Sequence, residues 1–83
     1  MNIQFKALPD ELHQLFAAVQ ERATLAGVES IKIEGIRYPT WGVYASVIWP
    51  RMGPGDEGRA VFVNMTAEGL AAELLVRVEA LTP

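Results

Sequence analysis

Hydrophobic and polar side chains alternate along several stretches of this chain, which is the pattern of β-strands. Ile3 and Phe5 alternate with polar residues between positions 2 and 7, and similar alternation runs through 31–50 and 60–65. Successive side chains of a strand point to opposite faces of a sheet, so one face of each stretch is apolar. We therefore predict a strand at 2–7, a hairpin over 31–50 and a last strand at 60–65.

The predicted hairpin, IKIEGIRYPTWGVYASVIWP, has a break in its alternation and an aromatic turn. Ile31 and Ile33 share one face but Ile36 has the opposite parity, so we expect a β-bulge at Gly35 to restore the pattern. The proline at position 39 suits a turn over 38–42, with Gly42 in a left-handed conformation. In the return strand, one face carries Val43, Ala45, Val47 and Trp49, and the other carries Tyr44, Ser46 and Ile48.

Hydrophobic residues recur every three or four positions in two other stretches, which predicts two amphipathic helices. The first begins near Pro9, whose missing N–H suits the first helical position, and ends at Gly27. The second follows Thr66, whose hydroxyl can cap the first turn. The buried stripes are Leu12, Leu15, Phe16, Val19, Ala23 and Ala26 in the first helix, and Leu70, Ala71, Leu74, Leu75, Val78 and Leu81 in the second. Glu68, Glu73, Arg77 and Glu79 lie on the other side of the second helix.

The resulting order of elements is β-α-β-β-β-α in a single α+β domain spanning 1–83. Two amphipathic helices require one apolar surface, which predicts a two-layer sandwich: a mainly antiparallel four-stranded sheet with both helices on one face. Whether the N-terminal strand pairs parallel or antiparallel stays open. The other face of the sheet is expected to be partly apolar, with Tyr44, Ile48 and Phe62, and such a patch usually marks an interface.

Composition narrows the class of protein. A hydrophobic fraction of 51% describes a globular chain, and the net charge of −3, spread without blocks, argues against binding to a nucleic-acid backbone. The lack of cysteine favours a reducing compartment and excludes disulfides. No apolar run approaches the roughly 18 residues of a membrane span, so we expect a cytoplasmic protein without a membrane partner.

Catalytic motifs are not evident in the sequence. The single histidine, His13, lies near Asp10 and Glu11, but we interpret it as a surface residue of a helix and not as a metal ligand or proton relay. Neither serine lies in a nucleophile-elbow motif. We therefore favour a non-catalytic binding protein, with no cofactor and no metal expected.

Aromatic and arginine residues are concentrated around the hairpin and the loop that follows it. These residue types dominate the energetic centres of protein interfaces. The loop over 50–59 is rich in proline and glycine, and we weigh it both as a contact loop and as a solvated connector. The tryptophans have a second interpretation as caps of a small core. The predicted partner-binding residues are Arg37, Tyr38, Trp41, Tyr44, Trp49, Arg51, Met52, Asp56, Glu57 and Arg59.

We interpret the chain as a small protein-interaction module that forms a homodimer and binds or inhibits a larger protein complex. In general character it is similar to the short, cysteine-free accessory proteins encoded by phages, including anti-defence inhibitors, which act by docking on host complexes. This similarity of size and lack of motifs implies a binding or inhibitory role. The alternative is a single-stranded nucleic-acid-binding domain that uses sheet aromatics as stacking platforms, which we favour less.

Overall fold

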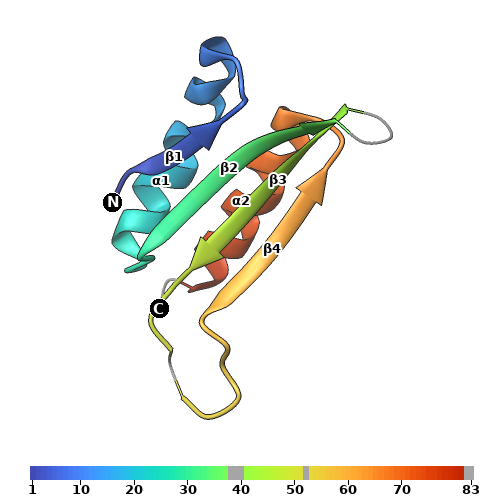
Figure 1. Ribbon diagram of the computed structural model, residues 1–83. Coiled ribbons are helices and arrows are strands. Elements are labelled where there is room, and N and C mark those ends of the chain that lie inside the picture. Colours follow the sequence, from blue (N-terminus) through green and yellow to red (C-terminus); the bar gives the residue numbers. More distant parts are fainter. Residues whose placement is uncertain (38–40, 52, 82–83) are drawn as a thin grey trace.

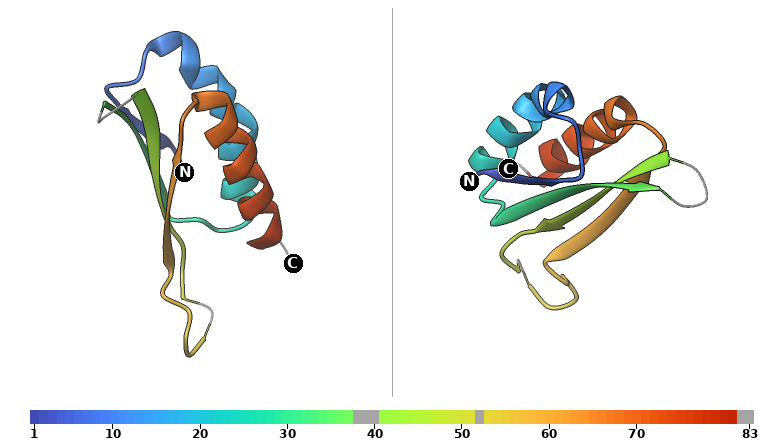
Figure 2. Two further views of the ribbon diagram at one scale, coloured as in Figure 1. Left: turned by 90° about the vertical axis from the view of Figure 1, so that its right-hand side faces the viewer. Right: turned by 45° about the horizontal axis from the view of Figure 1, so that its top comes forward.

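A sheet and two helices form the two layers of the fold. The computed structural model describes residues 1–37, 41–51 and 53–81, and of Arg37 and Trp41 it describes the backbone. The elements follow the order β1 (Ile3–Lys6), a 3-10 helix η1 (Asp10–Phe16), α1 (Ala17–Leu25), β2 (Ser30–Arg37), β3 (Trp41–Ile48), β4 (Arg59–Asn64) and α2 (Ala67–Leu81). Both helices lie on the same side of the sheet (Figures 1 and 2). The predicted α+β class, with four strands and two helices, is confirmed.

The sheet is mixed, and this corrects the prediction of a mainly antiparallel one. Its strand order is β1-β2-β3-β4; β1 pairs parallel with β2, and the other two neighbouring pairs are antiparallel. The reason is the connection, because η1 and α1 carry the chain back along the sheet before β2 begins, and such a crossover joins parallel strands. The order of elements also differs slightly from the predicted one, since η1 precedes α1.

The hairpin ladder has no bulge at Gly35, so that prediction is wrong. Pairing between β2 and β3 runs one to one from Ser30↔Ile48 to Arg37↔Trp41, including Gly35↔Val43. With the register unbroken, Ile36 stays on the face opposite Ile31 and Ile33. Gly42 pairs with Ile36 inside β3, and the glycines with positive φ are others, so its predicted left-handed conformation is also wrong.

The helix boundaries follow the capping residues. Gly27 has a φ of +79° directly after the last turn of α1, a conformation that glycine adopts without strain, and this confirms the predicted end. At the start of α2, the hydroxyl of Thr66 accepts a hydrogen bond from the N–H of Gly69 at 3.0 Å. This confirms the predicted cap, since it satisfies one of the free N–H groups of the first turn.

The hydrophobic core lies between the two layers. From the sheet, Ile31, Ile33, Val43 and Ala45 have no exposed surface, and from the helices, Ala23, Leu70, Leu74 and Val78 have none. Phe16 is the largest fully buried side chain, at 1% exposure. The face of the sheet that carries these residues is therefore the inner face, and the opposite face, toward the viewer in Figure 1, is the outer face.

Candidate protein interface

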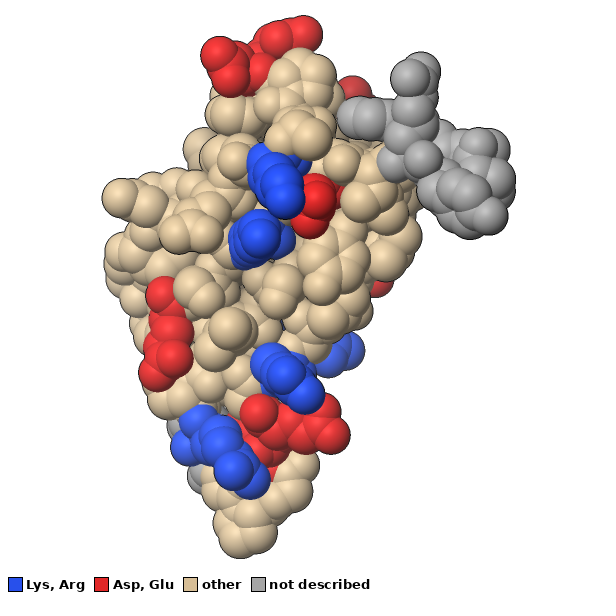
Figure 3. Space-filling model, viewed as in Figure 1, with Lys and Arg blue, Asp and Glu red and all other residues tan. Residues whose placement is uncertain are grey.

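The outer face of the sheet has a polar half and an apolar half. The polar half lies on β1 and β2, where Gln4 pairs with Lys32 and Lys6 pairs with Glu34. The ammonium group of Lys6 lies 3.8 Å from a carboxylate oxygen of Glu34. In the space-filling view of this face, charged side chains form groups separated by uncharged surface (Figure 3).

The apolar half lies on β3 and β4 and is called here the apolar outer face. Alternation along the two antiparallel strands places its members side by side, with Tyr44 opposite Val63 in the ladder. Large hydrophobic side chains are strongly exposed there: Ile48 at 40%, Val61 at 55%, Val63 at 60% and Met65, just past β4, at 72%. The members are Tyr44, Ile48, Val61, Val63 and Met65.

Phe62 was expected on this outer face, and that expectation is wrong. Its side chain packs against the core, on the side of β4 opposite Val61 and Val63. The reason is the position of α2, which contacts β3 and β4 on the inner face and so provides the hydrophobic surface that Phe62 meets. The placement of Tyr44 and Ile48 opposite the core-facing residues of β3 agrees with the predicted alternation.

The free edge of β4 is the second feature of this region. β4 ends the sheet, with β3 as its neighbour on one side. The N–H of Trp49 donates to the carbonyl of Gly58 at 2.8 Å, so from Gly58 onward every second residue directs its backbone groups toward β3. The backbone N–H and C=O groups of Val61 and Val63 consequently point away from the sheet. Arg59 begins the edge strand, and the residues that follow it, from Ala60 to Asn64, are uncharged.

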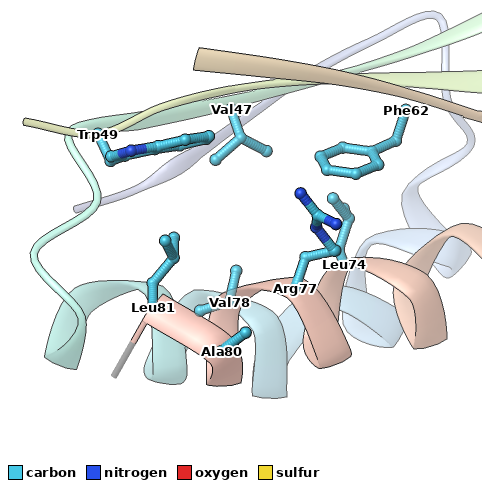
Figure 4. Close-up of a pocket in the computed structure, with 8 residues that line it drawn as sticks. All are labelled: Val47, Trp49, Phe62, Leu74, Arg77, Val78, Ala80 and Leu81. Atoms are coloured by element: carbon cyan, nitrogen blue, oxygen red, sulfur yellow. The ribbon is translucent and has the colours of Figure 1, made fainter. Parts of the chain in front are cut away.

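A groove lies on the inner face beside α2, and it is called here the α2 groove. Figure 4 shows side chains from β3 and β4 on one wall and from α2 on the other. The groove has a volume of about 230 Å³. It is lined by Val47, Trp49, Phe62, Leu74, Arg77, Val78, Ala80 and Leu81.

The α2 groove opens toward the β4 edge. Half-buried Ala71 and Leu75 lie on the flank of α2 that faces α1, whereas exposed Glu73, Arg77 and Ala80 lie on the opposite flank. The guanidinium carbon of Arg77 lies 5.6 Å from the centre of the Phe62 ring. Within the described part of the chain, no carboxylate forms an ion pair with Arg77. The groove therefore has an apolar floor and one cationic side chain at its rim.

The connection between β3 and β4 is organised by Asp56. Its carboxylate accepts hydrogen bonds from Trp49 Nε1, at 3.2 Å to each oxygen, and from the N–H of Gly58 at 2.9 Å. Its carbonyl accepts a hydrogen bond from Arg51 Nε at 2.8 Å. Gly58 has a φ of +72°, and a Cβ there would lie 2.8 Å from the carbonyl oxygen of Trp49. Trp49, Arg51 and Asp56 thus bind to one another within the loop.

The structure places the predicted partner-binding residues in different parts of the molecule, with Arg51 and Asp56 in the loop described above. Tyr44 belongs to the apolar outer face, Arg59 begins β4 on the same face and pairs with Ile48, and Glu57 is exposed in the loop. Half-buried Trp49 packs against the core and lines the α2 groove, as its interpretation as a core cap suggested. Met52 and residues 38–40 of the turn predicted over 38–42 lie outside the described residues, as do the side chains of Arg37 and Trp41, whereas Trp41 and Gly42 belong to β3 and not to a turn.

Sequence reasoning missed Arg77 and the edge of β4 as site elements. The sequence pattern predicted that Arg77 lies on the side of the second helix away from the core. The one indication that it lies near the groove was its position three residues after the buried Leu74. The exposure of Val61 and Val63 follows from the alternation in β4, but the free edge depends on the order of strands in the sheet. Both features therefore needed the tertiary structure.

The side chain of His13 is 32% exposed, so it reaches the surface as predicted but also packs against neighbouring residues. Its ring stacks on Phe5 with centroids 3.9 Å apart and planes 7° from parallel. Nε2 donates a hydrogen bond to the carbonyl of Leu8 at 3.0 Å. Phe5 also lies 5.8 Å from the Phe16 ring, so His13 belongs to an aromatic group that connects β1 to η1.

Comparison with known proteins returns no significant match, either to a family model, to a curated protein or to a solved structure. Over residues 1–37, 41–51 and 53–81, no helix combines the length and hydropathy needed to cross a membrane. No group of three or more acidic or histidine side chains in that same part of the chain is placed to hold a metal ion. The functional proposal therefore rests on the geometry of β3, β4 and α2.

Proposed function

We propose that the chain is a protein-interaction module that associates with a second copy of itself and binds a larger protein. The observation that carries the proposal is the apolar outer face. Four large hydrophobic side chains, each at least 40% exposed, lie on or directly after β3 and β4. Contiguous apolar patches of this kind mark interaction sites in soluble proteins, because covering them removes apolar area from water.

The distribution of charge supports a protein partner. Glu34 pairs with Tyr44, Lys32 pairs with Ser46 and Arg59 pairs with Ile48, so charges of both signs border the apolar outer face. An apolar centre with a polar rim is the usual composition of a protein interface. A larger protein with its own apolar patch is therefore the partner that fits this face.

The positions of the aromatic rings favour protein over single-stranded nucleic acid. Stacking of bases on a sheet requires aromatic side chains on its open face. Among the described residues, Phe16, Trp49 and Phe62 pack against or within the core, and Tyr44 is the aromatic residue of the outer face. Within the part of the chain that the structure describes, one ring and charges of both signs make a poor platform for a polyanion.

The form of this function that we favour is docking on, and inhibition of, a larger complex, as in phage accessory proteins. We also propose a non-catalytic mode of action and a cytoplasmic location. Docking on an existing assembly is supported by the exposed apolar surface of β3 and β4.

Affinity purification with matched variants tests the proposed function. Tagged wild-type protein, Ile48→Lys and the control Lys32→Glu are incubated with extract from the source organism, and retained proteins are quantified by mass spectrometry. Ile48→Lys places a charge on the apolar outer face, whereas Lys32→Glu changes the polar half. We expect a discrete set of proteins retained by wild type and control and lost with Ile48→Lys. Equal retention by all three, or salt-sensitive binding to mixed oligonucleotides instead, contradicts the proposal.

A further inference from the structure

We infer that two copies of the chain associate by antiparallel pairing of their β4 edges, which joins the two sheets into one. The inference rests on the self-association in the proposed function and names its surface. That surface is the outward backbone of β4 with the α2 groove on the inner face, whereas the larger partner is proposed to bind the side chains of the apolar outer face. Three independent features of this edge support a second copy as the occupant.

The first feature is the backbone of β4. The N–H and C=O groups of Val61 and Val63 point away from β3 and can each bond to another strand. Natural edge strands usually carry charges or prolines that prevent such pairing. β4 begins with the exposed charge of Arg59, but from Ala60 to Asn64 it has neither, and it is longer than the opposite edge strand, the four-residue β1. The central part of the β4 edge therefore lacks the usual protection.

The second feature is the spacing of the helices. The two helices lie side by side on a sheet of four strands, which are about 4.8 Å apart. Each helix therefore covers about two strands. If the sheet continues across β4, the second copy of α2 lies close to the usual helix separation of about 8–10 Å. Side chains of that helix and the second Phe62 then cover the α2 groove, which α2 alone leaves open.

The third feature is charge. In a register centred on Phe62, Val61 pairs with Val63 of the second copy, and the twofold axis passes beside the Phe62 ring. Arg77 lies over that ring, and Glu73 lies one turn earlier on the same exposed flank of α2. Both guanidinium groups then lie near the axis, and the pairing that we infer requires Glu73 of each copy, one turn away on the antiparallel helix, to compensate the charge of Arg77 of the other.

Such pairing also places the two apolar outer faces on the same side of one continuous sheet. The dimer then presents twice the apolar surface of a single copy to the larger partner. Association uses the backbone of Val61 and Val63 together with α2, whereas partner binding uses the side chains of the apolar outer face, so Ile48→Lys changes the second surface without changing the first.

The test is the solution mass, measured by light scattering after size-exclusion chromatography over micromolar to millimolar concentrations. For wild type we expect a shift toward twice 9.1 kDa as concentration rises. Val63→Pro keeps an apolar side chain but removes an N–H that points away from β3, so it blocks the edge while the bonds to β3 remain. We expect this variant to stay monomeric, with circular dichroism showing that it is folded. Wild type that stays monomeric at every concentration overturns the inference, even if partner binding is retained.

A charge exchange on α2 keeps the test informative if Val63→Pro does not fold. Arg77→Glu places like charges across the axis, and we expect dimer affinity to fall roughly tenfold, since two exposed pairs are affected. The double variant Glu73→Arg/Arg77→Glu restores opposite charges and is expected to recover affinity to within about threefold of wild type. Equal affinities for all three proteins overturn the inference.

The control Ile48→Lys distinguishes the two proposed surfaces. It changes the apolar outer face and leaves the β4 edge intact, so we expect it to dimerise as wild type does while losing the larger partner. If instead Ile48→Lys becomes monomeric and Val63→Pro still dimerises, copies associate through the outer face. That result overturns the edge pairing and leaves the protein-interaction function standing.

Discussion

The β1 edge and the β4 edge of the two-layer structure differ in how fully their apolar surface is covered. On the β1 side, Phe5 stacks on His13 and contacts Phe16, so rings from the edge strand and from η1 fill the space between sheet and helix. On the β4 side, Phe62 has Arg77 over its ring and the α2 groove beside it. One edge of the two-layer structure is packed by its own residues, and the other leaves apolar surface uncovered.

The difference comes from the connections. η1 lies between β1 and α1 and provides His13 and Phe16 to the β1 side. The step from β4 to α2 covers only two residues, Met65 and Thr66, so no additional element covers the β4 side. Residues that stabilise the monomer therefore concentrate near β1, and residues available to a partner concentrate near β4. Matched substitutions on the two sides test this contrast.

The largest difference is expected between Phe16→Ala and Phe62→Ala. Phe16 is 1% exposed, so its truncation leaves a cavity and should lower the free energy of unfolding by about 3–5 kcal/mol. Phe62 is half-buried beside an existing groove, and its truncation should cost about half as much. Urea denaturation of dilute protein measures both. Equal losses would mean that the β4 side is packed as tightly as the β1 side.

The next two substitutions enlarge a side chain instead of truncating it. Ala23 has no exposed surface, so Ala23→Leu overfills the core and should lower the free energy of unfolding by about 1–3 kcal/mol. Ala80 is exposed and lines the α2 groove, where a leucine has room; Ala80→Leu should therefore change stability by less than about 0.5 kcal/mol. Thermal unfolding in dilute solution compares the two. A strongly destabilising Ala80→Leu would show that the groove is not available to additional side chains.

A smaller effect is expected at His13. His13→Ala removes the stacking on Phe5 and the hydrogen bond to the carbonyl of Leu8, which together should cost about 1–2 kcal/mol of unfolding free energy. His13→Phe keeps the stacked ring and should recover about half of the loss. Arg77→Ala on the other side removes one exposed cation–π contact, worth about 0.5–1 kcal/mol. A larger loss for Arg77→Ala than for His13→Ala in urea titrations would reverse the contrast.

The smallest effect is expected at the charged end of β1. Lys6 is 65% exposed and its contact with Glu34 is 3.8 Å long, so Lys6→Ala should change the free energy of unfolding by less than about 0.5 kcal/mol. The matched change Glu34→Ala should give a value of the same size. Denaturant midpoints in low and high salt measure both variants. A loss above about 1 kcal/mol that disappears in high salt would show that this pair, and not the aromatic group, stabilises the β1 side.

Some residues of the candidate protein interface could be predicted from the sequence, and others could not. Tyr44 and Ile48 have the opposite parity to the buried Val43, Ala45 and Val47, so alternation alone assigned them to a shared face. The roles of Trp49 and Asp56 depended on a hydrogen bond between residues seven positions apart, which no pattern in the loop specifies. Arg77 required the position of Phe62 on the far side of the groove.

The sequence by itself determined the strands, the helices, the cap at Thr66 and the end of α1 at Gly27, because side-chain period and backbone preference act over neighbouring residues. Tertiary structure decided the parallel pairing of β1, the unbroken ladder at Gly35 and the face that α2 covers. Parity states which residues share a face, but packing between distant elements selects the face that is buried. For the same reason, only the assembled sheet leaves β4 at its edge and makes that edge available to a partner.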